Sequence, residues 1–340
     1  MPIRHAIAIT LAAAALLPLA GCNRDDSPSA RVVVYTSVDQ PVAEPILREF
    51  EKKTGIKVDI QTDTEATKSA GLAARLQAEK ANPQADVWWG NEVFHTINLA
   101  ESGVLVGYES PSAKDIPPQF KDRQHRWAGY CLRARVLAVS TATGAPPDAK
   151  NVTGLEAMRN PAFKNRVAMA RPSAGTTGGH VAALYVLWGD EKADAFFRDL
   201  RGNGVKLLGG NSVVADQVGQ GIVWVGMTDN DDVDAANKAG GQVEMVLPDQ
   251  GAEGQGTLTI PCTVGLIAGA KHTDAARKLI DYLLSAEVER KLIDAKFGRY
   301  SVRGGAGSEA VKTMRVDYAA VARALPHSVE RAGQILEGRK

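Results

Sequence analysis

The sequence is short of the residues that many specialised folds require. Its 340 residues include only three cysteines, and aromatic residues make up 6% of the chain. Lys and Arg number 40 against 39 Asp and Glu, a formal net charge of +1, so neither sign dominates. A nucleic-acid surface needs a basic stripe, a zinc-ligand spacing or interleaved aromatic residues, and none of these appears in the sequence. We therefore expect no nucleic-acid partner.

Long hydrophobic runs are missing after the first twenty residues. The apolar run at 6–19 follows two basic residues; it has the length of a signal-peptide core and is too short to cross a bilayer. It leads into Leu-Ala-Gly-Cys at 19–22, which resembles a bacterial lipobox. We predict a signal peptide at 1–21, lipidation of Cys22, a polar tether at 22–30 and an extracytoplasmic, periplasmic protein anchored to the membrane. Ordinary secretion with Cys22 as an incidental residue is the alternative.

Catalytic motifs are absent as well. The sequence has no nucleophile elbow, no metalloprotease helix motif and no spacing typical of a catalytic triad. His95 and His180 show no ligand spacing, which argues against zinc or copper. We expect a protein that is not an enzyme. An exported hydrolase that uses paired carboxylates as acid and base is the alternative from another class.

The two remaining cysteines, Cys131 and Cys262, are candidates for a disulfide in an exported chain. Each begins or precedes an apolar run, at 132–140 and 263–268. If those runs pair antiparallel, the cysteines lie at opposite ends, beyond the roughly 7 Å between Cα atoms that a bridge can span. This placement favours two free thiols.

The sequence does contain a repeated alternation of strand-like and helix-like segments. Residues 32–35 form a short β-branched run, and alternation at 56–60 predicts a second strand. The helix between them carries Ile46, Leu47 and Phe50 on one face. Such a unit implies a parallel sheet. The same order starts again in the middle of the chain, and a chain of this length is expected to form two lobes. The predicted fold class is therefore α/β.

The most unusual stretch lies at 222–237, where an apolar run leads into four aspartates within six residues. Like charges this close repel each other unless water, a helix N-terminus or a cation offsets them. The end of a strand is also the usual position of a ligand site in an α/β protein. Asp229, Asp231 and Asp232 are therefore candidate site residues. The structural alternative is that one of them caps a helix, and Asp234 is expected at the surface.

Groups that suit an anion follow two other predicted strands. The turn at Gly175, Thr176 and Thr177 offers N–H groups and hydroxyls at a helix N-terminus. Thr36 and Ser37 offer the same chemistry after the first strand. We expect these residues to contribute to ligand binding.

Groups that suit a cation are Asp39, Glu65 and the pair Asn91 and Glu92, each of which follows a predicted strand. For Asp39 the alternative is an acid that is favoured in the first turn of a helix by the helix dipole. For Glu65 the alternative is a solvated acid in a loop. Since both kinds of group are present, we expect a ligand that carries a positive and a negative charge. It is a metal ion with a synergistic anion, or a small zwitterion such as an aminophosphonate. Carboxylates suit hard cations, and the candidate metal ligands are Asp39, Glu65, Asp231 and Asp232.

Several segments resemble the extracellular solute-binding proteins of bacterial ABC importers. They are Val-Tyr-Thr-Ser at 34–37, Phe-Glu-Lys-Lys-Thr-Gly-Ile-Lys-Val at 50–58, Ala-Asp-Val-Trp-Trp at 85–89, Gly-Thr-Thr at 175–177, Gly-Asn at 210–211 and Ala-Ala-Arg-Lys-Leu-Ile-Asp-Tyr-Leu-Leu-Ser at 275–285. The most similar branch includes ferric-ion-binding proteins, and the series spans most of residues 31–303.

The resemblance implies a two-lobed type II periplasmic-binding-protein fold, in which each lobe is a mixed sheet flanked by helices. Lobe 1 would comprise 31–133 and 263–305, and lobe 2 would comprise 134–262 and 306–340. Two crossing strands would act as a hinge, and the ligand would lie in the cleft. The resemblance also implies a monomer whose closed form is read by an ABC permease and its ATPase. No cofactor is implied apart from a ferric ion with its anion as cargo.

One departure from the family concerns the ligand. Ferric-binding relatives carry adjacent tyrosines at the positions aligned with Asp231 and Asp232, and often a histidine at the position of Asp39. The predicted function is that of an importer's binding lipoprotein for ferric ion with an anion, or for a related cation. A binding protein for a small zwitterion or organic cation is the alternative. A sensing subunit that hands its closed form to a receptor is a third hypothesis.

Overall fold

A computed structural model describes residues 30–63, 69–304 and 311–339. Its first half is built on three parallel strands, with β1 (Arg31–Thr36) between β2 (Lys57–Thr62) and β3 (Val87–Gly90). The connecting helices are α1 (Gln40–Thr54) and α2 (Ala70–Ala78), and α3 (Phe94–Glu101) follows β3. The βαβ unit predicted from the first sixty residues is confirmed.

The second half repeats this plan. Strand β6 (Val167–Ala170) lies between β7 (Lys206–Leu208) and β8 (Val225–Asp229), and both pairs are parallel. The helices of this half are α4 (Gly175–Trp188), α5 (Asp190–Gly202), α6 (Asn211–Gly219) and α7 (Asn230–Lys238). Their order confirms that the alternation of strand and helix starts again in the middle of the chain.

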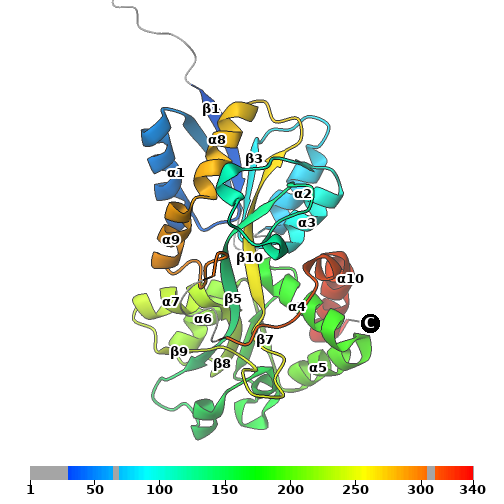
Figure 1. The fold of residues 1–340 in the computed structure, drawn as a ribbon. Coiled ribbons are helices and arrows are strands. Elements are labelled where there is room, and N and C mark those ends of the chain that lie inside the picture. The colour runs from blue at the N-terminus through cyan, green and yellow to red at the C-terminus, as the bar shows by residue number, and fades with distance from the viewer. Residues whose placement is uncertain (1–29, 64–68, 305–310, 340) are drawn as a thin grey trace, which may run out of the picture.

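Two long strands join the halves. β5 (Ala128–Ser140) and β10 (Thr259–Ile267) are antiparallel to each other, and the sheet order is β2-β1-β3-β10-β5-β8-β6-β7. β4 (Leu105–Val106) pairs with β10, and β9 (Val243–Val246) pairs with β5. β5 pairs with β10 up to Ala134 and with β8 from Arg135. Both strands run between the upper and lower halves of the molecule (Figure 1). The predicted α/β fold with mixed sheets flanked by helices is confirmed.

The core lies on both faces of this sheet. Along β1, Val32 and Val34 belong to one buried cluster, and Val33 and Tyr35 belong to the other. The remaining helices are α8 (Thr273–Leu283), α9 (Ala286–Asp294) and α10 (Tyr318–Glu337), and α10 packs on α3, α4 and α5. Short 3₁₀ helices occupy several connections, at Pro111–Ala113, Pro118–Phe120, Pro147–Asn151, Leu155–Arg159 and Pro161–Phe163. Within the described ranges, the helices are too short or too polar for a bilayer crossing.

The prediction that Cys131 and Cys262 lie at opposite ends of paired strands is wrong. β5 begins at Ala128 and β10 at Thr259, so both strands start before the apolar runs that were used to place them. The cysteines therefore lie inside the strands, and they are direct partners in the register. Both are fully buried, and no disulfide joins them in this structure.

Candidate functional site

Two buried arginines on β5 organise the candidate site. Arg133 and Arg135 are two residues apart and so project from the same face of the strand; they are 2% and 0% exposed. Removing an unpaired guanidinium from water costs several kcal/mol, so each needs a nearby counter-charge. β8 pairs with β5 and places Asp229 opposite Arg135 in the register.

Asp229 is the shared counter-ion of these arginines. Arg133 Nη2 lies 3.1 Å from its Oδ2, and Arg135 Nη1 lies 2.8 Å from its Oδ1. Thr176 and Asn211 also donate to Oδ2, at 2.5 and 3.2 Å. Burial raises the pKa of Asp229, but the two positive charges outweigh it and hold the pKa at about 2. Asp229 is therefore an ionised side chain surrounded by donors.

Asp231 is the second acidic partner of Arg133, whose Nη2 lies 2.6 Å from its Oδ2. Burial, the largest cause, raises the pKa of Asp231 against the opposing charge of Arg133; with the negative charges of Asp229 and Asp39, which also raise it, the pKa is about 6. A charge acts on a pKa in this way only from close by. Asp39 and Asp231, predicted from distant segments, therefore interact electrostatically.

Asp232 has a capping function. Asp229 is the N-cap of α7, and Asp232 is the third residue of that helix. Its Oδ2 accepts hydrogen bonds from the backbone N–H of Asp229 at 3.3 Å and from Thr228 Oγ1 at 3.0 Å. This reciprocal arrangement is a capping box. Asp234, expected at the surface, is half-buried, and burial raises its pKa.

The threonines at the start of α4 are buried and hydrogen-bonded inside the protein. Arg135 Nη1 donates to Thr176 Oγ1 at 3.1 Å, and Thr177 Oγ1 donates to Asn211 Oδ1 at 2.8 Å. Their hydroxyls thus fix the positions of the buried ions rather than project toward solvent. The groups that this turn can offer to a ligand are the N–H groups of the helix N-terminus, which begins at Gly175.

The first half contributes mainly neutral groups. Thr36 Oγ1 donates to a carbonyl of β3 at 2.9 Å. Ser37 Oγ donates to Asn91 Oδ1 at 3.0 Å and accepts from the Asn91 N–H at 3.0 Å, and Ser69 Oγ donates to the same Oδ1 at 2.6 Å. Asp39 is the N-cap residue of α1 and is partly exposed.

These two sets of residues meet at a small cavity. It is lined by Asn91 from the first half and by Arg133, Ala174, Gly175, Thr176, Gly210, Asn211, Asp229 and Asp232. Its volume is about 10 Å³, close to the space that one water needs, so a larger solute requires the walls to separate. Nε and Nη1 of Arg133 are buried and have no hydrogen-bond partner among the described residues. Arg133 is itself one of the residues that line the cavity.

Some predicted residues lie elsewhere. Glu65 and Cys22 fall outside the described residues, so their expected functions stay predictions. Among the described residues, the acids whose oxygens lie within 4.8 Å of one another are Asp229, Asp231 and Asp232, without Asp39. Glu92 is buried and accepts from the backbone N–H of Phe94 at 2.6 Å, so it caps α3.

The sequence analysis missed the two arginines. Arg133 and Arg135 are charged residues within β5, a strand that is buried along its whole length. Charged side chains at positions i and i+2 of a strand share one face, and a buried strand carries such charges only when a partner is present. That spacing was the signal that could have located the site.

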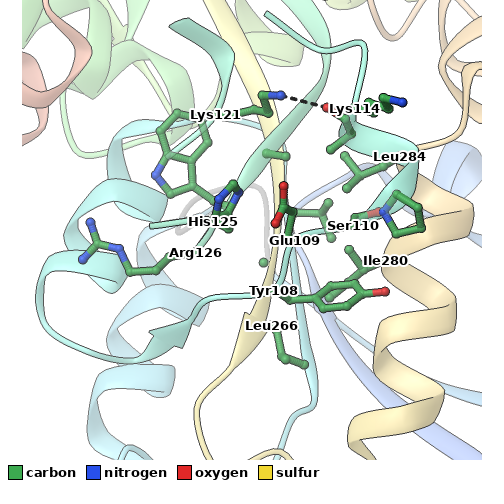
Figure 2. A pocket seen from close by; sticks show the side chains of 16 residues that line it. Tyr108, Glu109, Ser110, Lys114, Lys121, His125, Arg126, Leu266, Ile280 and Leu284 are labelled. Atoms are coloured by element: carbon green, nitrogen blue, oxygen red, sulfur yellow. Dashed lines mark hydrogen bonds between the residues drawn. The ribbon is translucent and has the colours of Figure 1, made fainter. Parts of the chain in front are cut away.

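A larger cavity of about 360 Å³ lies in the first half, and none of the predicted site residues lines it. Figure 2 shows its rim with Lys114, Lys121 and His125. Its polar groups bind one another: Lys121 Nζ donates to the Ala113 carbonyl at 2.9 Å, and Tyr108 and Ser110 bind Asp281. Because these groups hold the walls together, we place the candidate site at the smaller, charged cavity.

Comparison with known proteins identifies the family. Residues 30–298 match the family described as bacterial extracellular solute-binding protein. The chain belongs to this family. This solute-binding protein is 24% identical over 282 residues to iron uptake protein A1 of Synechocystis, with 80% of this chain and 76% of the relative covered. It is 22% identical over 254 residues to a putative 2-aminoethylphosphonate-binding periplasmic protein of Salmonella typhimurium, with 73% and 71% covered.

Solved structures agree on the fold of this solute-binding protein. A ferric binding protein from Campylobacter jejuni aligns with a TM-score of 0.77 and 21% identity, covering 89% of this chain and 99% of that one. The neighbours are type II periplasmic binding proteins, and family and neighbours are binding proteins rather than enzymes. The family match makes the chain a bacterial extracellular solute-binding protein, and the Salmonella relative is named as periplasmic.

Proposed function

We propose that this protein captures a small zwitterion for an ABC importer, a solute with an oxyanion beside an ammonium group, such as an aminophosphonate or an amino-acid-like compound. The observation that carries the proposal is the unpartnered pair of donors on Arg133, which is 2% exposed. A buried guanidinium with open donors is suited to an oxyanion, because hydrogen bonds between ions are roughly twice as strong as neutral ones.

The surroundings of Arg133 support both charges of such a solute. The N-terminus of α4 lines the same cavity, and its N–H groups favour an anion. Asp231 and Asp39 lie close enough for the charge of one to raise the pKa of the other. An ammonium group between them relieves that repulsion. The oxyanion would therefore face Arg133 and α4, and the ammonium group would face the two acids.

Ferric ion with a synergistic anion is the second candidate. It is supported by the cluster of Asp229, Asp231 and Asp232, whose oxygens lie within 4.8 Å of one another, and by the iron-uptake relative. The arginines count against it. Asp229 already accepts from Arg133 and Arg135, and a trivalent cation beside two guanidinium groups is repelled. The zwitterion therefore fits the charges better.

A thermal-shift and calorimetric screen tests the choice. The signal-less protein is titrated with 2-aminoethylphosphonate, amino acids, inorganic phosphate, and ferric salts with citrate. A ligand stabilises the native state by RT ln(1 + [L]/Kd), so a tight binder raises the melting temperature in excess ligand. We expect the zwitterions to give the largest shift. A larger shift with ferric citrate would favour the metal.

An Arg133→Gln variant separates these outcomes further. Loss of a buried charge-assisted contact lowers affinity for the zwitterion by on the order of 100-fold. Arg159→Gln is the matched control, because that arginine is partly exposed and pairs with Glu156 and Asp199 away from the site. An unchanged affinity in Arg133→Gln would contradict the placement of the ligand.

The wider organisation is part of the same proposal. The lobes would be 31–133 with 263–305 and 134–262 with 306–340, and the change of β5 from pairing with β10 to pairing with β8 after Ala134 supports a boundary there. Cys22 would carry a lipid anchor, and the monomer would deliver its solute to a permease and its ATPase. Mass spectrometry of the mature N-terminus tests the anchor.

A further inference from the structure

Cys131 and Cys262 face each other across the two strands that join the halves. They are partners in the antiparallel register of β5 and β10, and both are fully buried. Directly opposite residues in such a pair have Cβ atoms about 4.5–5.5 Å apart, and a disulfide needs about 3.5–4.5 Å, so a shift of about 1 Å brings the two into range. The pKa of the Cys131 thiol is raised well above its ordinary value, first by burial and then by the neighbouring Cys262. Little movement therefore separates two thiols from a bridge.

The groups that surround the two thiols do not suggest metal binding. Cys262 Sγ donates to the Asn91 carbonyl at 3.3 Å, so its neighbour is a backbone group of the site wall. Gly298 packs against Cys131 so tightly that a Cβ there would lie 3.0 Å from Sγ. Neither Cys131 nor Cys262 belongs to the cluster of metal-ligating groups found among the described residues. Two buried thiols on directly opposite strand positions, outside that cluster, suit a covalent link.

We propose that Cys131 and Cys262 form a disulfide in the exported protein and so staple β5 to β10 where the halves meet. Each thiol loses a proton, one S–S bond forms, and two electrons pass to a disulfide-bearing thiol oxidase outside the cytoplasm, whose disulfide becomes two thiols. The bridge encloses residues 132–261, which include all of β6 to β9 and α4 to α7. It also fixes the strand register two residues from Arg133.

The position of the pair determines when the bridge forms. The attacking species is a thiolate, and burial raises the pKa of Cys131 well above its ordinary value. Oxidation is therefore expected while the chain folds, before the pair is enclosed. Once formed, the bridge lies out of reach of reductants in the native protein.

Peptide mapping of the full chain exported to an oxidising periplasm tests the proposal. The protein is denatured in an alkylating reagent without reductant and digested with trypsin. We expect the peptide 127–133, which holds Cys131, to be linked to the peptide 239–271, which holds Cys262. Separately alkylated peptides would overturn the proposal, and so would linkage of either cysteine to Cys22 or to a second chain.

Two further measurements serve as a control for this test and as a check on the effect of the bridge on stability. A Cys262→Ala variant must show Cys131 alkylated without reductant, which establishes that the assay detects a free thiol at this site. In the wild type, reductant under denaturing conditions followed by refolding should lower the melting temperature by about 10 °C, because the closed loop is long. Native protein treated with the same reductant should keep its bridge. An unchanged melting temperature after reduction would contradict the staple.

Discussion

The two walls of the candidate site use different chemistry. One wall holds buried or half-buried ions: Arg133, from the part of β5 that joins the halves, with Arg135, Asp229 and Asp231 from the second half. The wall from the first half is a network of hydroxyls and an amide around Asn91, with Asp39 at its edge. Buried ions fix the orientation of a charged ligand at a high desolvation cost, whereas neutral groups add contacts at little cost. We infer that the ion-bearing wall selects the ligand and that the neutral wall completes its enclosure.

The largest expected effect is on the folding of the ion-bearing wall. Asp229→Ala removes the counter-ion that Arg133 and Arg135 share, and an uncompensated buried charge costs about 3–5 kcal/mol of stability. Urea unfolding of the unliganded protein measures the loss. Asp199→Ala is the control, because Asp199 is 55% exposed and its ion pair with Arg159 is expected to contribute about 1 kcal/mol or less. Similar losses of unfolding free energy in the two variants would show that the buried ions of this wall contribute no more to stability than an exposed ion pair.

The next effect has the opposite sign. The pKa of Asp231 is about 6 in the folded protein, against 3.8 for an ordinary aspartate. Its charged form therefore opposes folding above pH 6, and this cost declines as the pH falls through 6 toward 3.8. Asp231→Asn should be more stable than wild type by about 2–3 kcal/mol at pH 8. The gain should shrink by more than half at pH 4.5.

Urea unfolding at both pH values checks this result, with Asp199→Asn as the control that shows no such dependence. If Asp231→Asn were less stable than wild type at pH 8, the ion pair with Arg133 would outweigh the burial of the carboxylate. A stabilised variant that also binds the zwitterion at least tenfold more weakly would show that Asp231 is kept for its ligand.

The sequence predicted the fold better than the details of the site. Apolar periodicity identified the βαβ unit, because burial on one face leaves a period in the sequence. It did not give the full length of β5 and β10, since the polar and small residues at their starts carry no apolar signal. The register of Cys131 with Cys262 was missed for that reason.

The acidic stretch shows the same limit within the site. Four aspartates in six residues predicted that some of them serve a ligand, but the pattern treated Asp231 and Asp232 as equals. Their difference comes from tertiary partners: Asp231 pairs with Arg133, and Asp232 accepts from the backbone of its own helix. Arg133, on which we base the choice of a zwitterion over a metal, lies about a hundred residues earlier in the chain, so the acidic stretch by itself could not reveal it.

A smaller effect is expected in the neutral wall. Ser37→Ala removes a hydroxyl that donates to Asn91 Oδ1 and accepts from the Asn91 N–H. A buried N–H left without a partner costs about 1–2 kcal/mol. Because no ion is involved, the loss in urea unfolding should be the same at 50 mM and 500 mM salt. A strong salt dependence would mean that this wall also carries functional charge.

The smallest effect separates the two neighbouring aspartates. Asp232 accepts from the backbone N–H of Asp229 and from the hydroxyl of Thr228, and it caps α7. Asp232→Ala should therefore cost about 1 kcal/mol in urea unfolding, as the loss of a helix cap does. Calorimetry should show an affinity for the zwitterion within about threefold of wild type, because the partners of the cap belong to the protein rather than to the ligand. An affinity loss equal to that of Asp231→Asn would place both carboxylates on the ligand, as ferric binding by the cluster requires, and the ion-bearing wall would then be a metal site.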